Sequence, residues 1–113
     1  MAFYTYEFEV PANTPENSSV TKTVQALSQK LATLRLIIPN GHQGLARIRI
    51  ESRGRVIAPS SGSDPPWIRG DGVSVDMTPN LLLEGPPWEI TFVGWNADTT
   101  FSHAFIVYAD LLP

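Results

Sequence analysis

Four arginines and one glutamate occupy eleven consecutive positions in the segment LARIRIESRGR, residues 45–55. Charged and aliphatic residues alternate along most of this segment, which predicts a strand with one core-facing side and one charged side. The charged side carries Arg47, Arg49, Glu51 and Arg53. Because guanidinium groups bind carboxylates and phosphates, this side is a candidate surface for an anionic partner.

An arginine from the preceding predicted strand is expected to lie beside this column. The Pro-Asn-Gly turn signal at 39–41 follows an apolar run at 31–38 that contains Arg35. A hairpin through residues 39–44 would place Arg35 near Arg47 or Arg49, giving one basic cluster. We therefore treat the following residues as interface candidates: Arg35, Arg47, Arg49, Arg53 and Arg55.

The occupant of this basic cluster remains open. It can face solvent, contact the acidic half of the same molecule or of a neighbouring copy, or bind an acidic glycan or a nucleic acid. Residues 1–69 carry a net charge of +3, whereas residues 70–113 contain six acidic residues and no basic one. Nucleic acid is the least favoured occupant, because Glu51 interrupts the column, the pI is about 5.2 and no aromatic side chain is interleaved with it.

Few residues in the chain are suited to catalysis. Cysteine is absent, which excludes thiol chemistry, disulfides and thiolate metal sites. His42 lies in a turn and is expected to be solvated, and His103 is expected to make a structural hydrogen bond. A catalytic triad could be composed from Ser102, His103 and Asp98, but no nucleophile-elbow motif supports it. We predict that the protein is not an enzyme and has no catalytic residues, metal or cofactor.

Tryptophan offers an alternative kind of binding site. Trp67 and Trp88 each follow a pair of prolines at the start of a strand, where an exposed indole could stack on a sugar. In that interpretation Asp71 and Asp76 would line the same concave surface. The simpler interpretation is that each indole packs on the preceding proline. Trp95 ends a strong strand and is expected in the core or in an interface.

The elements that position these residues are almost all strands. Apolar and polar residues alternate over most of the chain, and ten prolines and eight glycines argue against long helices. Strands are predicted at 3–10, 20–27, 31–38, 45–53, 56–59, 88–95 and 103–112, with two more short ones flanking the Gly-Asp-Gly turn within 67–77, and residues 80–85 form a short apolar segment.

This spacing predicts an all-β fold. We expect one domain over residues 1–113, a jelly-roll-like antiparallel β-sandwich of eight or nine short strands. The aromatic residues cluster at the two ends of the chain, so the first strand is expected to pair beside the last. Residues 1–19 would then supply that strand and an arm that reaches a neighbouring copy.

No segment directs the chain to a membrane. The longest apolar run is well short of the roughly 18 residues that a membrane span needs, and we expect no signal peptide because the first ten residues contain two glutamates and no basic residue. A chain of this size buries its many apolar residues poorly alone, so a homo-oligomer, a trimer or larger, is expected.

The short, turn-rich, cysteine-free chain with its terminal arm resembles the small all-β proteins of virus and phage particles, such as capsid decoration proteins. The resemblance covers the whole chain loosely and implies no numbered site residue. It implies a non-enzymatic protein that stabilises a capsid, with a major capsid protein as a partner, located in the virion after assembly in the host cytoplasm. Outside a virus the location expected is cytoplasmic. The alternative function is a carbohydrate- or receptor-binding β-sandwich module.

Overall fold

The computed structural model describes residues 2–26, 29–59, 67–85 and 87–112. Within these ranges the chain forms nine strands and one short 3-10 turn, and no α-helix. No helix in the described part of the chain is long and apolar enough to cross a membrane. The elements are β1 (Ala2–Val10), η1 (Glu16–Ser18), β2 (Val20–Ala26), β3 (Lys30–Ile38), β4 (Ala46–Ser52), β5 (Arg55–Ala58), β6 (Val73–Met77), β7 (Leu81–Leu82), β8 (Trp88–Asn96) and β9 (His103–Leu112).

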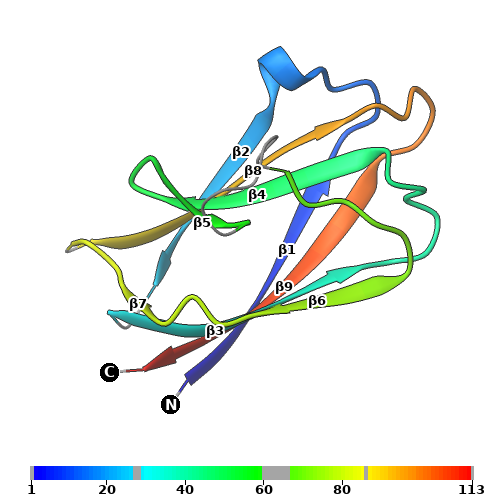
Figure 1. The fold of residues 1–113 in the computed structure, drawn as a ribbon. Coiled ribbons are helices and arrows are strands. Elements are labelled where there is room, and N and C mark those ends of the chain that lie inside the picture. The colour runs from blue at the N-terminus through cyan, green and yellow to red at the C-terminus, as the bar shows by residue number, and fades with distance from the viewer. Residues whose placement is uncertain (1, 27–28, 60–66, 86, 113) are drawn as a thin grey trace.

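The strands form two antiparallel sheets packed face to face (Figure 1). Sheet A has the order β1-β9-β3-β6, with the short β7 also paired to β3, and sheet B has the order β2-β8-β4-β5. Apart from the short β7, each sheet has four strands, and two sheets that exchange strands in this way form the jelly-roll type of double Greek key. The expected all-β, jelly-roll-like sandwich is therefore confirmed, as is the pairing of the first strand with the last, which runs from Ala2↔Leu111 to Val10↔His103.

The core lies between the sheets and follows from the alternation in the sequence. Along β4, Ala46, Ile48 and Ile50 are buried while the arginines between them are partly exposed. Aromatic side chains fill the centre, where the Phe92 ring lies 5.9 Å from that of Phe8. The buried residues of both sheets thus form a single hydrophobic core.

The hairpin expected through residues 39–44 is wrong. β3 belongs to sheet A and β4 to sheet B, so this connection crosses from one sheet to the other. β3 already has β9 on one edge and β6 with β7 on the other, and β4 is flanked by β8 and β5. The two apolar faces therefore meet across the core instead of lying side by side. The turn is made with positive φ angles at Gly41, Gln43 and Gly44.

Two other expectations need correction. Within 67–77 only β6 is a regular strand, because residue 68 pairs with the chain only through an isolated bridge. Residues 13 and 14 hydrogen-bond to the 96–98 segment of the same chain, so this part of the N-terminal segment is not an extended arm.

Candidate functional site

The outer face of sheet B gathers arginine and tryptophan side chains from three segments. Arg47 lies opposite Trp95 in the β4–β8 ladder. On the other side of β4, Ile48 and Ile68 form an antiparallel bridge with backbone hydrogen bonds of 2.8 and 3.0 Å. This bridge holds residues 67–69 alongside a part of β4 that does not pair with β5.

The bridge determines which side chains share the outer face. Ile68 packs against the core, as Ile48 does, so the residues on either side of it project outward. Trp67 is thereby placed across from Arg49, and Arg69 across from Arg47. We call the outward-facing set the guanidinium–indole cluster; it consists of Arg47, Arg49, Trp67, Arg69 and Trp95.

Arginine and tryptophan stack in pairs within this cluster. The guanidinium carbon of Arg47 lies 4.2 Å from the centre of the Trp95 ring, and that of Arg49 lies 4.5 Å from the centre of the Trp67 ring. The two indoles meet edge to face, with their centres 6.2 Å apart. The expectation that no aromatic side chain interleaves the arginine column is therefore wrong, because the indoles come from distant parts of the sequence.

The five arginines expected in one basic cluster are dispersed. Arg35 lies on the outer face of sheet A, where its Nε donates to Asp76 at 2.7 Å. Arg49 pairs with Glu51. Arg53, in the turn after β4, donates to the backbone carbonyls of Glu84 (3.1 Å) and Pro87 (2.6 Å). Arg55 is exposed at the start of β5, so only Arg47 and Arg49 stay together in the guanidinium–indole cluster.

The residues expected to line a sugar-binding surface do not converge either. Trp67 belongs to the guanidinium–indole cluster, whereas the partly buried Trp88 packs against the core at the beginning of β8. Asp71 accepts a hydrogen bond from the backbone N–H of Gly41 at 2.7 Å, in the loops that join the sheets. Asp76 pairs with Arg35 on sheet A, which lowers the pKa of its carboxyl group.

The outer face of sheet A is unusually apolar at its centre. Cross-strand pairing places Thr5, Tyr108, Arg35 and Asp76 in one row, and Glu7, Ile106, Ile37 and Ser74 in the next. The second row therefore has polar ends and an apolar middle, whereas in the first row Tyr108 lies beside Arg35, which is paired with Asp76. We call this surface, centred on Ile37, Ile106 and Tyr108, the apolar face.

Two further features mark the apolar face. A wide, shallow depression of about 820 Å³ opens on it and includes Ile37 and Tyr108 in its lining. Tyr108 remains 39% exposed. Asp110 is buried on the same face, and one of its carboxylate oxygens has no hydrogen-bond partner in the described part of the chain. A buried acceptor of this kind is normally paired.

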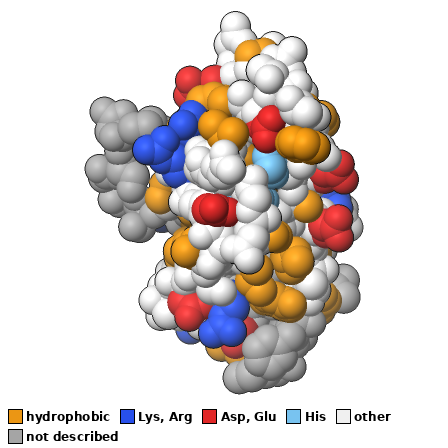
Figure 2. Space-filling view, turned by 90° about the vertical axis from the view of Figure 1, so that its right-hand side faces the viewer, with side chains coloured by type: hydrophobic (Ala, Val, Ile, Leu, Met, Phe, Trp, Pro, Cys, Tyr) orange, Lys and Arg blue, Asp and Glu red, His pale blue; other side chains and the backbone are white. Residues whose placement is uncertain are grey.

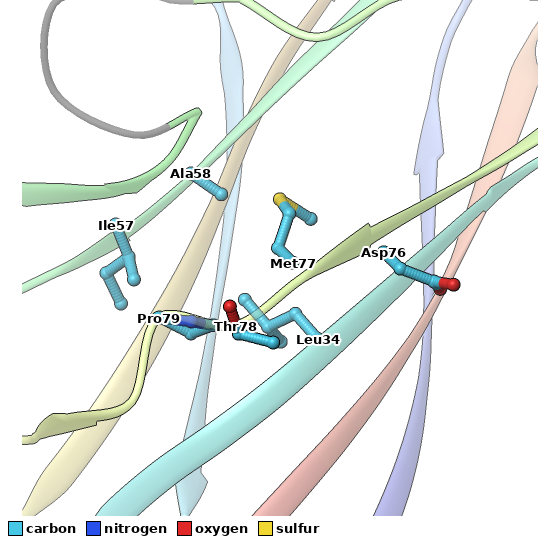
Figure 3. Close-up of a pocket in the computed structure, with 7 residues that line it drawn as sticks. All are labelled: Leu34, Ile57, Ala58, Asp76, Met77, Thr78 and Pro79. Atoms are coloured by element: carbon cyan, nitrogen blue, oxygen red, sulfur yellow. The ribbon is translucent and has the colours of Figure 1, made fainter.

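A small cavity of about 300 Å³ lies at the open edge of the sandwich, between β5 and the β3–β6 pair (Figure 3). The side chains of Ile57 and Ala58 descend from one sheet toward Met77 and Leu34 of the other, and the carboxylate of Asp76 points away from them. Most of its lining residues are apolar, and because the Asp76 carboxylate points away, Thr78 is left as the single polar side chain at its wall, too little to orient a ligand.

The two histidines lie together at one end of the sandwich, where the loops 39–45 and 97–102 meet. Figure 2 shows this end, with histidine surface between hydrophobic and acidic side chains. The ring centres of His42 and His103 are 4.5 Å apart. The expectation of a solvated His42 is wrong, since its side chain is only 2% exposed and packs edge-on against Phe105.

Hydrogen bonds fix the states of both rings. His42 Nε2 lies 2.9 Å from the carbonyl oxygen of Ala104, which can only accept, so Nε2 carries the hydrogen and the buried Nδ1 lacks a partner among the described residues. His103 Nε2 donates to Asp98 Oδ2 at 2.8 Å. Hydrogen bonds from the Thr100 N–H, then from His103 and the Phe101 N–H, lower the pKa of Asp98.

This arrangement organises a loop, and its geometry is not that of a catalytic triad. Asp98 holds the turn through two backbone N–H groups and one imidazole. Within the described residues, no hydroxyl group hydrogen-bonds to either imidazole, and no three histidine, aspartate or glutamate side chains are placed to hold a metal ion. The absence of enzymatic activity stays a prediction.

Stability is expected to fall as the pH drops from 7 to 5, because of His42. Burial, and then the neighbouring His103, lower its pKa below the ordinary value, against weaker opposite effects of the Ala104 carbonyl and Asp71. The unfolded chain therefore binds a proton near pH 6.5 that folded His42 does not bind until lower pH, and the free energy of unfolding declines by at most about 1.4 kcal/mol per pH unit from this group.

Urea unfolding of the wild type and of His42→Gln between pH 5 and 8 measures this contribution. We expect the variant, which cannot titrate at this position, to show a flatter dependence below pH 6.5. Equal slopes for the two proteins would contradict the assignment to His42.

Comparison of the chain with known protein families finds no match, and comparison with curated protein sequences finds none either. The functional argument therefore depends on the geometry of the surfaces described above.

Proposed function

We propose that the protein is a non-enzymatic structural component of a virus or phage particle, which decorates or stabilises the capsid through contacts between β-sandwiches. In this proposal the copies form a homo-oligomer, a trimer or larger, and a major capsid protein is a further partner. The observation that carries the proposal is the apolar face of sheet A.

An antiparallel sheet that faces water normally presents polar side chains on that side. Here Ile37 and Ile106 are directly paired neighbours in the two central strands, with Tyr108 beside them. Interfaces between proteins have centres that are rich in aromatic and aliphatic residues and poor in charge, with a polar rim. Asp76 on one edge strand and Glu7 on the other fit such a rim, and Arg35, which lies beside Tyr108 in the face, is paired with Asp76.

One more feature is compatible with a role in assembly. The jelly-roll architecture is common among viral capsid and lectin domains, although a fold alone does not determine a function.

Ile106→Lys tests the role of the apolar face. Its side chain lies in the middle of the face, so a lysine there would place a charge within the contact and is expected to shift the protein from oligomer to monomer. Size exclusion with light scattering measures this shift. The control is Thr23→Lys, which adds the same charge at an exposed position of β2 in sheet B.

An unchanged mass for Ile106→Lys, or the same dissociation in Thr23→Lys, would contradict assembly through this face. For the particle role, the chain should be recovered by mass spectrometry from density-purified virus particles. Recovery only from the soluble fraction of infected cells would argue against that role.

A further inference from the structure

Two arginines in the guanidinium–indole cluster have no ion-pair partner among the residues that the structure describes. The Ile48–Ile68 bridge places Arg47 and Arg69 across from each other on neighbouring segments. Like charges directly opposite one another on a sheet are destabilising. Neither guanidinium forms an ion pair with any residue in the described part of the chain, whereas the adjacent Arg49 is paired with Glu51. An anion from outside the chain would relieve this repulsion.

The indoles hold this site in shape. Stacking on Trp95 keeps the guanidinium of Arg47 in a fixed plane, so less side-chain freedom is lost when an anion binds. Trp67 is itself anchored, because its Nε1–H donates to the carboxylate of Glu16 at 2.9 Å. The two indoles therefore hold the cluster in a fixed arrangement before any ligand binds.

These groups border a groove of about 450 Å³ whose lining residues are Glu16, Arg47, Trp67, Arg69 and Trp95. This volume falls within the range of small-molecule sites. The groove combines two cations, an aromatic wall and one carboxylate that can accept hydrogen bonds from hydroxyl groups.

We propose that this groove binds an anionic glycan, with the carboxylate of a sugar on Arg47 and Arg69 and the sugar ring against Trp67. Guanidinium groups match a carboxylate in bidentate geometry. Glu16 favours a hydroxyl-rich ligand and repels a chain of phosphates, so a sugar acid suits the groove better than a nucleic acid does. The site lies on sheet B, away from the apolar face, and does not depend on the proposed assembly.

Tryptophan fluorescence provides the test, because two of the three tryptophans line the groove. The wild type is titrated with trigalacturonic acid and with 3′-sialyllactose in about 150 mM salt, with maltotriose as the neutral comparison. We expect saturable quenching by at least one acidic sugar and none by maltotriose. Arg47→Ala and Arg69→Ala should each weaken binding about tenfold, the loss expected for one charge-assisted hydrogen bond.

Arg55→Ala is the matched control, since it removes an exposed arginine of the same sheet outside the groove. It should bind as the wild type does. The proposal is overturned if neither acidic sugar quenches at concentrations up to about 10 mM. It is also overturned if maltotriose binds equally, if a short oligothymidylate binds more tightly, or if Arg55→Ala loses as much affinity as Arg69→Ala.

Discussion

Phe92→Ala is expected to lower the free energy of unfolding by about 3–5 kcal/mol, the range for truncating a buried phenylalanine. The ring of Phe92 is completely buried in the centre of β8 and meets the rings of Tyr6 at 5.6 Å and Phe8 at 5.9 Å. These contacts connect sheet B to the first strand of sheet A. Since the free energy of unfolding of a small domain is typically only about 5–15 kcal/mol, this substitution would remove a large part of the stability of the fold.

Urea unfolding followed by circular dichroism measures the effect of this substitution. Phe101→Ala is the matched control, because it makes the same change at a ring that is 66% exposed and should alter stability by less than about 0.5 kcal/mol. Similar losses in the two variants would show that the assigned core is wrong.

Asn96→Ala is expected to cost about 3 kcal/mol, although only one amide group is removed. The side chain is 1% exposed. Its Nδ2 donates to the carbonyl oxygens of Val10 (3.3 Å), Pro11 (3.3 Å) and Phe101 (3.0 Å), and its Oδ1 accepts from the N–H of Asp98 at 2.9 Å. Truncation would leave several of these backbone groups buried without partners.

The asparagine therefore joins the end of β1 to the loop that carries Asp98 and His103. Hydrogen exchange of the Asp98 amide should accelerate in Asn96→Ala, in addition to the loss of global stability. Asn17→Ala, at an exposed position of η1, is the control and should leave both properties unchanged. Retained protection of the Asp98 amide would contradict the role given to Asn96.

The strands were predictable because their alternation and their turns are local properties of the sequence. β4 shows this most clearly, since each expected core residue between Ala46 and Ile50 is buried and each arginine between them faces outward. The pairing of β1 with β9 was predictable from the clustering of aromatic residues at the two ends of the chain.

The sites were less predictable, because periodicity identifies the face of a strand but not the neighbour of that face. Residues 39–44 look like a hairpin turn, yet they carry the chain from sheet A to sheet B, and Arg35 is thereby separated from Arg47. Trp67 joins the arginines only through the isolated bridge at Ile68. The sequence predicted a short strand before the Gly-Asp-Gly turn, but nothing local in it indicated that this segment would pair with β4.

Buried polar residues were missed for a related reason. His42 lies in a Gly-rich turn, where histidine is usually solvated, and its burial depends on Phe105 and His103 from the far end of the chain. Asn96 follows Trp95 at the end of a strand and gives no sign of its contacts with Val10 and Pro11. Such contacts join segments distant in sequence.

The native mass of the wild-type protein, measured by light scattering at low and high salt, tests self-association most directly. We expect an oligomer of the 12.4 kDa chain that persists at high salt, because the proposed contact is the apolar face and salt does not screen apolar contacts. An oligomer that dissociates in salt would instead assign the contact to charged groups such as Arg47 and Arg69. A monomer at both salt concentrations would contradict assembly altogether.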